Sequence, residues 1–185
     1  MSTSNVTICN AALGMLGAQS ISSLDDSTER ARLCKDVYPQ ARAQLLRLHP
    51  WNCATKRALL APLTTAPAFG YSYQYQLPDD YVRVQSVDAQ EYELEGRKLL
   101  SNQSSIALVY TYDAPEGVWD SLLIEAMSLL LASKLSKAIT GSSTDAAERM
   151  YQFKELVKQA RSVDGQEQPV GMIDPYESSL LSVRY

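Results

Sequence analysis

Apolar residues in the first part of the chain recur every three or four positions, which is the spacing of one helix face. Between residues 5 and 16 this pattern is preceded by Ser4, a good N-cap residue. It is followed by Gly17, which can take the left-handed conformation that ends a helix. The sequence therefore predicts a first helix over residues 5–16.

A second helix is predicted to begin near Asp26, because Asp26 and Glu29 have the spacing of a capping box. Its apolar face continues to Leu48, and His49-Pro50 ends it. Pro39 lies inside this segment and is expected to kink or divide the helix, since proline lacks a backbone donor and clashes with the preceding turn.

After residue 50 the helical pattern changes to the alternation of half-buried strands. The alternation is clearest over residues 71–77, where apolar and aromatic side chains alternate with serine and glutamine. Glu95-Gly96 indicates a hairpin turn, and residues 64–70, which include Phe69, form an irregular loop. We expect an antiparallel sheet of about four to six strands, drawn from residues 53–61, 71–77, 81–87, 92–94, 99–100 and 106–112.

The last third of the chain returns to helical spacing. Residues 116–139 are apolar over a wide arc, so this helix is expected to be the buried hub of the fold. Gly141 should end it, and an amphipathic helix follows over residues 145–163. No helical or strand period continues beyond Gly165.

These elements predict an α+β fold, in which a four-helix bundle has a small antiparallel β-sheet inserted between its second and third helices. The α+β domain would span residues 1–163, with helical parts at 1–50 and 115–163 and a β-insertion at 51–114. Residues 164–185 would form an extended C-terminal interaction tail.

Composition argues against nucleic acid as a principal partner. The formal net charge is −4 and the isoelectric point is about 5.0, whereas duplex-binding domains carry clustered basic surface. The first 20 residues lack the pattern of a signal peptide, and the longest apolar stretch, residues 122–132, is interrupted by Glu125 and Ser128. We therefore expect a soluble protein that is made in the cytoplasm and has no membrane partner.

Candidate chemistry is sparse, and no catalytic, cofactor-binding or metal-binding residue is predicted. The chain has a single histidine, His49, whose place before Pro50 favours a role at a helix C-terminus over catalysis. Cys9 and Cys34 occupy apolar helix positions and are expected to be buried thiols, and no cysteine pair has zinc-ligand spacing. We predict that the protein is not an enzyme.

The C-terminal segment carries more large apolar side chains than a disordered tail normally would. Because residues 164–185 are too irregular to build a core, they are expected either to fold back on their own domain or to dock on a neighbouring subunit. The irregular loop of residues 64–70, whose apolar Phe69 is expected beside a sheet edge, is a second candidate contact. The predicted protein-interface residues are Tyr176, Leu180, Leu181, Val183, Tyr185 and Phe69.

Several short motifs resemble one known family. They are the segment Asn10-Ala11-Ala12-Leu13-Gly14-Met15-Leu16-Gly17, the step Pro50-Trp51-Asn52 out of the second helix, and an aromatic strand that leads into Leu77-Pro78-Asp79-Asp80-Tyr81. Over residues 5–163 the chain resembles tail tubular protein A, the head–tail adaptor or head-to-tail connector of short-tailed phages.

The resemblance implies a virion structural protein at the head–tail junction. It implies a ring, expected to be dodecameric, that joins neighbouring copies of the chain beneath the portal protein and receives the tail or nozzle protein. DNA would pass through the ring without specific binding, and the C-terminal segment would contribute to ring or portal contacts. The alternatives from other classes are a phage-encoded assembly chaperone or scaffold and a cell-wall hydrolase.

Overall fold

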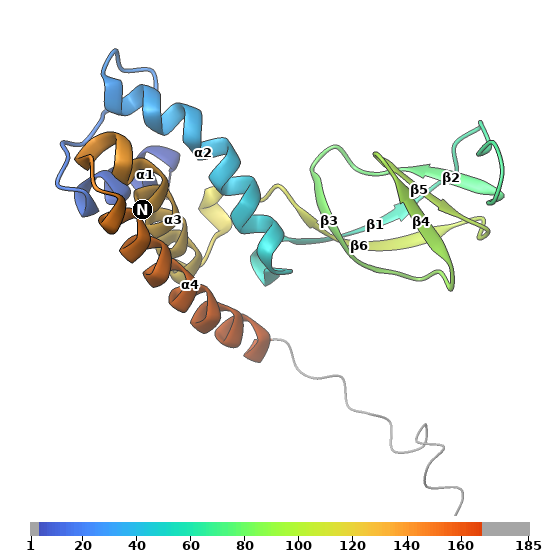
Figure 1. Ribbon diagram of the computed structural model, residues 1–185. Helices are drawn as coiled ribbons and strands as arrows, with labels where there is room; N and C mark the ends of the chain where they lie inside the picture. The colour runs from blue at the N-terminus through green and yellow to red at the C-terminus, as the bar shows by residue number, and fades with distance from the viewer. Residues whose placement is uncertain (1–3, 168–185) are drawn as a thin grey trace, which may run out of the picture.

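Four helices form one lobe and six strands form the other in residues 4–167, the part of the chain that the computed structural model describes (Figure 1). We call them the helical lobe (α1–α4) and the β-lobe (β1–β6). In chain order the strands follow α2 and precede α3, so the polypeptide crosses between the lobes twice.

α1 spans Asn5–Met15 and buries the face that contains Ile8, Cys9, Ala12 and Leu13. Ser4 is its N-cap, as the sequence predicts, and accepts a hydrogen bond from the Thr7 backbone nitrogen. Gly17 follows the helix with a φ of 68°, the left-handed conformation that favours glycine.

α2 spans Glu29–Leu48, and the predicted capping box at Asp26 is wrong. Thr28 is the N-cap and accepts from the Ala31 nitrogen, while the Asp26 carboxylate accepts from the backbone nitrogens of Ser22 and Ser23 in the preceding loop. The helix is continuous through Pro39, so proline does not divide it.

α3 spans Ser121–Thr140 and is the centre of the helical lobe. Eleven of its 20 residues are buried, and it packs against α1, α2 and α4, whereas α1 and α2 make little contact with each other. The helix begins later than predicted because Glu116–Val118 forms a short 3₁₀ turn and Asp120 is the N-cap. Gly141 ends it in the left-handed conformation, with a φ of 72°.

The predicted four-helix bundle with one small sheet is wrong. The strands lie between the first two helices and the last two, and they form two three-stranded antiparallel sheets. In a four-helix bundle, all four helices surround a common core. Here α3 is itself buried on most sides, and α1, α2 and α4 pack around it. Periodicity shows that a helix is apolar over a wide arc but does not show which neighbours cover that arc.

The first sheet has the order β1-β6-β3, from Thr55–Leu60, Ile106–Tyr112 and Tyr81–Val87. The second has the order β2-β5-β4, from Tyr73–Gln76, Lys98–Ser101 and Tyr92–Glu95. The predicted bounds of β3 and β6 and the hairpin at Gly96 are confirmed. Both sheets contribute to one apolar core, made of Tyr75, Leu77, Leu99, Ile106, Leu108 and Tyr110.

α4 spans Ser143–Gln166 and continues beyond its expected end at residue 163. Residues 164–166, which the sequence assigned to the tail, are therefore helical, and Asp164 is buried. The remainder of the predicted interaction tail, residues 168–185, lies outside the described residues.

Candidate protein-interaction site

Exposed apolar side chains gather on the β-lobe. Phe69 is 87% exposed and Leu59 is 80% exposed, although both are large hydrophobic residues. Phe69 is the one predicted interface residue that the structure describes. The other five, Tyr176, Leu180, Leu181, Val183 and Tyr185, lie outside the described residues.

The loop that carries Phe69, residues 61–72, is anchored at both ends. At its start, the Leu63 nitrogen donates to the Gln74 carbonyl over 2.8 Å, and the Gln74 side chain donates back to the Thr65 carbonyl over 2.6 Å. At its end, the backbone nitrogen and the hydroxyl of Ser72 both bond to Asn102 Oδ1. The loop is therefore held by β2 and by the turn after β5 while Phe69 points to solvent.

The first crossing between the lobes is fixed by the C-terminal end of α4. His49 Nε2 lies 3.0 Å from Asp164 Oδ2, and the Asn52 backbone nitrogen donates to Asp164 Oδ1 over 3.0 Å. The Asn52 amide also donates to the Asp164 carbonyl over 2.7 Å. Trp51, between them, is fully buried and donates its indole N–H to the Leu45 carbonyl over 3.0 Å.

The second crossing, between β6 and α3, is fixed by Arg42 of α2. Its guanidinium forms an ion pair with Asp113, lies 3.0 Å from the Glu116 carboxylate and donates to the Ala114 carbonyl over 2.7 Å. The Tyr38 hydroxyl donates to the same Glu116 carboxylate over 2.9 Å. Burial and the neighbouring Glu116 charge raise the pKa of Tyr38, so its hydroxyl stays a donor at neutral pH.

The Leu77-Pro78-Asp79-Asp80-Tyr81 motif positions the first sheet next to this crossing. Asp80 accepts from Lys56 Nζ over 2.6 Å and from the Tyr110 hydroxyl over 3.0 Å, and its carbonyl accepts from the Asp113 nitrogen over 2.7 Å. Partial burial opposes ionisation of Asp80, but the hydrogen bonds from Lys56 and Tyr110 lower the pKa of its carboxyl below the usual range. Burial and the bond to Asp80 raise the pKa of Tyr110 to about 12. In this chain the motif thus forms a clamp, in which Asp80 joins the start of β3 to Lys56 of β1 and Tyr110 of β6.

We expect Asp80→Asn to destabilise the protein at neutral pH by about 1–2 kcal/mol, because it weakens two hydrogen bonds to a partly exposed charge. Since the folded-state pKa is lowered, this stabilisation is present above the unfolded value of about 4 and is lost as pH falls through the folded value. Urea unfolding of both proteins between neutral and acidic pH measures the difference, which should shrink with acid.

Asp79→Asn is the matched control for that experiment, because Asp79 is the adjacent carboxylate and its side chain is fully exposed. Its expected effect is within about 0.5 kcal/mol at every pH. Equal effects of the two substitutions would contradict the clamp.

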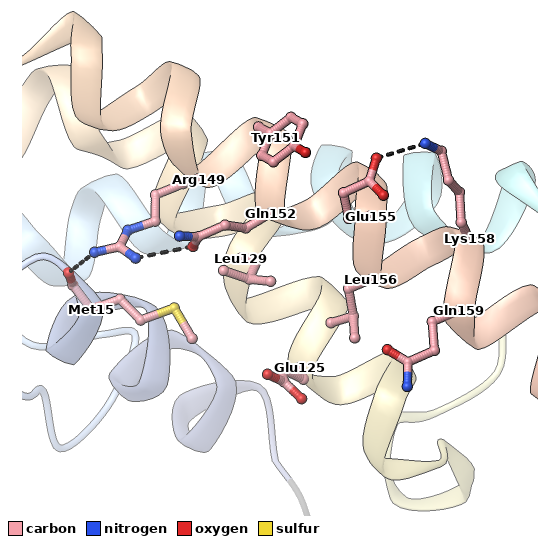
Figure 2. Close-up of a pocket in the computed structure, with 10 residues that line it drawn as sticks. All are labelled: Met15, Glu125, Leu129, Arg149, Tyr151, Gln152, Glu155, Leu156, Lys158 and Gln159. Carbon is pink, nitrogen blue, oxygen red and sulfur yellow. Dashed lines mark hydrogen bonds and ion pairs between the residues drawn. The ribbon is translucent and has the colours of Figure 1, made fainter.

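A groove of about 850 Å³ crosses the helical lobe between α1, α3 and α4 (Figure 2). Arg149 donates to the Met15 carbonyl and to the Gln152 side chain, and Glu155 pairs with Lys158 along the same helix. Arg149, Glu155 and Lys158 are therefore occupied with neighbouring side chains or with the backbone, and the charged groups that line the groove do not converge on a common point (Figure 2).

The features of residues 4–167 that bear on chemistry or on membranes are their potential metal ligands, their thiols and the hydrophobicity of their helices. Residues 4–167 hold no group of three or more side chains that could bind a metal ion. Cys9 and Cys34 are buried, as predicted, and their contact together with burial raises the pKa of the Cys9 thiol. Burial and the nearby Asp120 charge raise the pKa of Cys53 to about 11, which keeps its thiol protonated at neutral pH. In the same range, no helix has the length and hydrophobicity that a bilayer crossing requires.

Sequence reasoning missed two features of the site. Leu59 alternates with Ala58 and Leu60 in a strand, but nothing in the sequence shows which alternate face is covered. Asp164 was assigned to a tail, yet it lies in the last turn of α4 and accepts a hydrogen bond from Asn52 at the first crossing. The sequence carries no signal for this contact, because an acidic residue is normally exposed and becomes buried only with a partner that the sequence does not reveal.

No protein-family model matches the chain, and no curated protein is significantly similar to it.

Proposed function

We propose that this chain is a structural head–tail adaptor subunit of a tailed phage. In that role copies form a ring that binds the portal protein on one side and the tail or nozzle protein on the other. The ring stands at the head–tail junction of the virion, and DNA passes through its centre.

The observation that carries the proposal is a β-lobe that presents apolar side chains to solvent while two separate crossings fix it to the helical lobe. Phe69 and Leu59 are almost fully exposed, and the crossings at Asp164 and Arg42 each use several hydrogen bonds. Exposed apolar side chains on a held surface favour binding to other proteins, because the ordering of the surface does not have to occur during association.

The residues that resemble tail tubular protein A also support the proposal. Asn10 of the first motif bonds to both the nitrogen and the carbonyl of Ile21, Trp51 of the second fills the first crossing, and Asp80 of the third clamps the first sheet. Each motif therefore determines the shape of the protein, which suits a structural subunit.

The net negative charge of the chain is consistent with a channel through which DNA passes. With a formal net charge of −4, the protein lacks the excess of basic residues that would hold DNA by its phosphates. A wall that repels or ignores phosphate would let the duplex slide during ejection.

Sedimentation of the purified chain, alone and with the portal ring encoded in the same genome, tests the proposal. We expect the protein to sediment with the portal at about one copy per portal subunit, as a closed adaptor ring requires. An unrelated protein of similar size and charge serves as the control. Absence of portal binding, together with absence of the protein from purified virions, would favour the assembly-chaperone alternative.

A further inference from the structure

β1 and β4 are edge strands, one in each sheet of the β-lobe, and β3 and β2 form the opposite edges. Within the described residues, the ladder of β1 is formed with β6 alone and that of β4 with β5 alone, so each strand lies at the edge of its sheet. All four residues of β4 are exposed. An unpaired edge presents backbone donors and acceptors that another strand can use, unless the protein protects it.

The core-facing sides of both edges are mainly apolar, with Lys56 at the start of β1 as the exception. On β1, Ala58 and Leu60 pack against the core of the β-lobe. On β4, Leu94 lies opposite Leu99 of that core, and opposed residues of an antiparallel pair share a face. Tyr92 is on the same face, and both it and Leu94 remain 41% exposed, so the β4 edge leaves apolar surface that one more strand would cover.

The outer faces of the two edges carry opposite charge. Glu93 and Glu95 alternate with the apolar residues of β4, whereas Arg57 and Leu59 occupy the outer face of β1. None of these three charged residues takes part in an ion pair of residues 4–167. The outer face of β1 also has a shallow apolar hollow, lined by Arg57, Ala58, Leu59, Ala107, Leu108 and Val109.

We propose that the β4 edge of one copy pairs with the β1 edge of a second copy, so that two three-stranded sheets join into one continuous sheet. In this arrangement Arg57 of one molecule lies beside Glu93 and Glu95 of the next, and the apolar inner faces become continuous. Pairing of β4 with another β4 is disfavoured because the same glutamates would then face each other.

The contact is head-to-tail. Each copy uses two different surfaces, β4 toward one neighbour and β1 toward the other, and such contacts repeat until they close into a ring or continue as a filament. The inference deepens the proposed function, because it names the surface through which neighbouring subunits of the ring would meet. The charges and exposed edges on which it stands do not depend on the portal.

Charge reversal tests the pairing in the full-length chain. Arg57→Glu and the pair Glu93→Arg with Glu95→Arg should each weaken self-association by about tenfold or more, measured by sedimentation velocity across concentrations up to the solubility limit. A chain that carries all three substitutions should associate again, and so should an equimolar mixture of the two single-edge variants. Added salt should weaken association of the unmodified protein.

Lys158→Glu and Glu155→Arg on α4 are the matched controls, because they reverse exposed charges on the helical lobe and should leave association unchanged. Thermal unfolding of every variant verifies folding, and rescue by the combined substitutions excludes a folding defect as the cause of a loss. Unchanged association of both single-edge variants overturns the pairing, as does a chain that stays monomeric both at its solubility limit and on the portal.

The portal measurement separates this failure from failure of the proposed function. If the charge-reversed variants bind portal rings as the unmodified chain does, the adaptor role stands and the edge pairing is wrong. If concentrated protein associates through these edges but the portal does not bind it, the pairing stands and the adaptor role is wrong.

Discussion

Trp51→Ala is expected to lower the free energy of unfolding by about 3–5 kcal/mol, the largest effect of any single substitution proposed for this chain. Trp51 is fully buried where the chain leaves α2 for the β-lobe, its ring packs edge-on against His49 at 4.7 Å, and its indole N–H reaches the Leu45 carbonyl. Truncation removes the ring, leaves a cavity and leaves that carbonyl without its donor. Urea unfolding followed by circular dichroism measures the change.

Two further variants separate the contributions. Trp51→Phe keeps most of the buried ring but loses the indole donor, so we expect a cost of about 1–2 kcal/mol. Tyr151→Ala removes an aromatic ring that is 62% exposed on α4 and should change stability by less than about 0.5 kcal/mol. A loss below 1 kcal/mol for Trp51→Ala would show that the first crossing does not depend on this packing.

The two tryptophans of the chain have equivalent places in the fold. Trp51 stands at the crossing from α2 to the β-lobe and Trp119 at the crossing back to α3, and each donates its indole N–H to a nearby backbone carbonyl over 3.0 Å. Trp119 also lies beneath the Arg42 guanidinium, 5.9 Å from the ring centroid. Each crossing therefore combines a buried aromatic ring with a charged group that bonds to the backbone.

Local chemistry was sufficient to predict most elements. Ser4, Gly17 and Gly141 mark helix ends through capping and left-handed backbone conformations, and Gly96 marks a hairpin, each within a few residues of the structural feature. Asp26 failed as a cap because Thr28, two residues later, has the same capacity and is closer to the helix start. Sequence spacing cannot decide between two competent caps.

Tertiary arrangement was beyond the sequence for a different reason. The hydrophobic arc of residues 116–139 correctly predicted a buried helix, which the structure places at Ser121–Thr140. A four-helix bundle and a central helix with three neighbours place the same demand on that arc. The split into two sheets depends on which strands pair, and β1 and β6 pair across more than forty intervening residues. Alternation specifies a face of a strand and not its partner.

The candidate site was predictable only in part. Phe69 was identified as an apolar residue in an irregular loop. Its side chain is exposed in the structure, and its part in an interface stays a prediction. The sequence alone did not relate the charges of β1 to those of β4, because that relation depends on where each strand lies in its sheet. Edge position is a property of the sheet and cannot be inferred from either strand alone.

Phe69→Ser is expected to leave folding intact while weakening binding to the portal or to the tail protein by about thirtyfold or more. The side chain is 87% exposed, so its removal costs the folded monomer little. An aromatic ring that becomes buried in an interface often contributes 2 kcal/mol or more, which corresponds to about thirtyfold in affinity. Because the loop is anchored at Leu63 and Ser72, the substitution should not disturb the neighbouring strands.

Co-sedimentation with portal rings and, separately, with the tail protein measures the effect, and thermal unfolding verifies that the variant is folded. Tyr151→Ser is the matched control, since it removes an exposed aromatic ring from the helical lobe and should retain full binding if the interface lies on the β-lobe. Loss in one assay alone identifies which partner the Phe69 loop meets. Full binding by Phe69→Ser in both assays would remove the loop from the interface and shift attention to the opposed charges of β1 and β4.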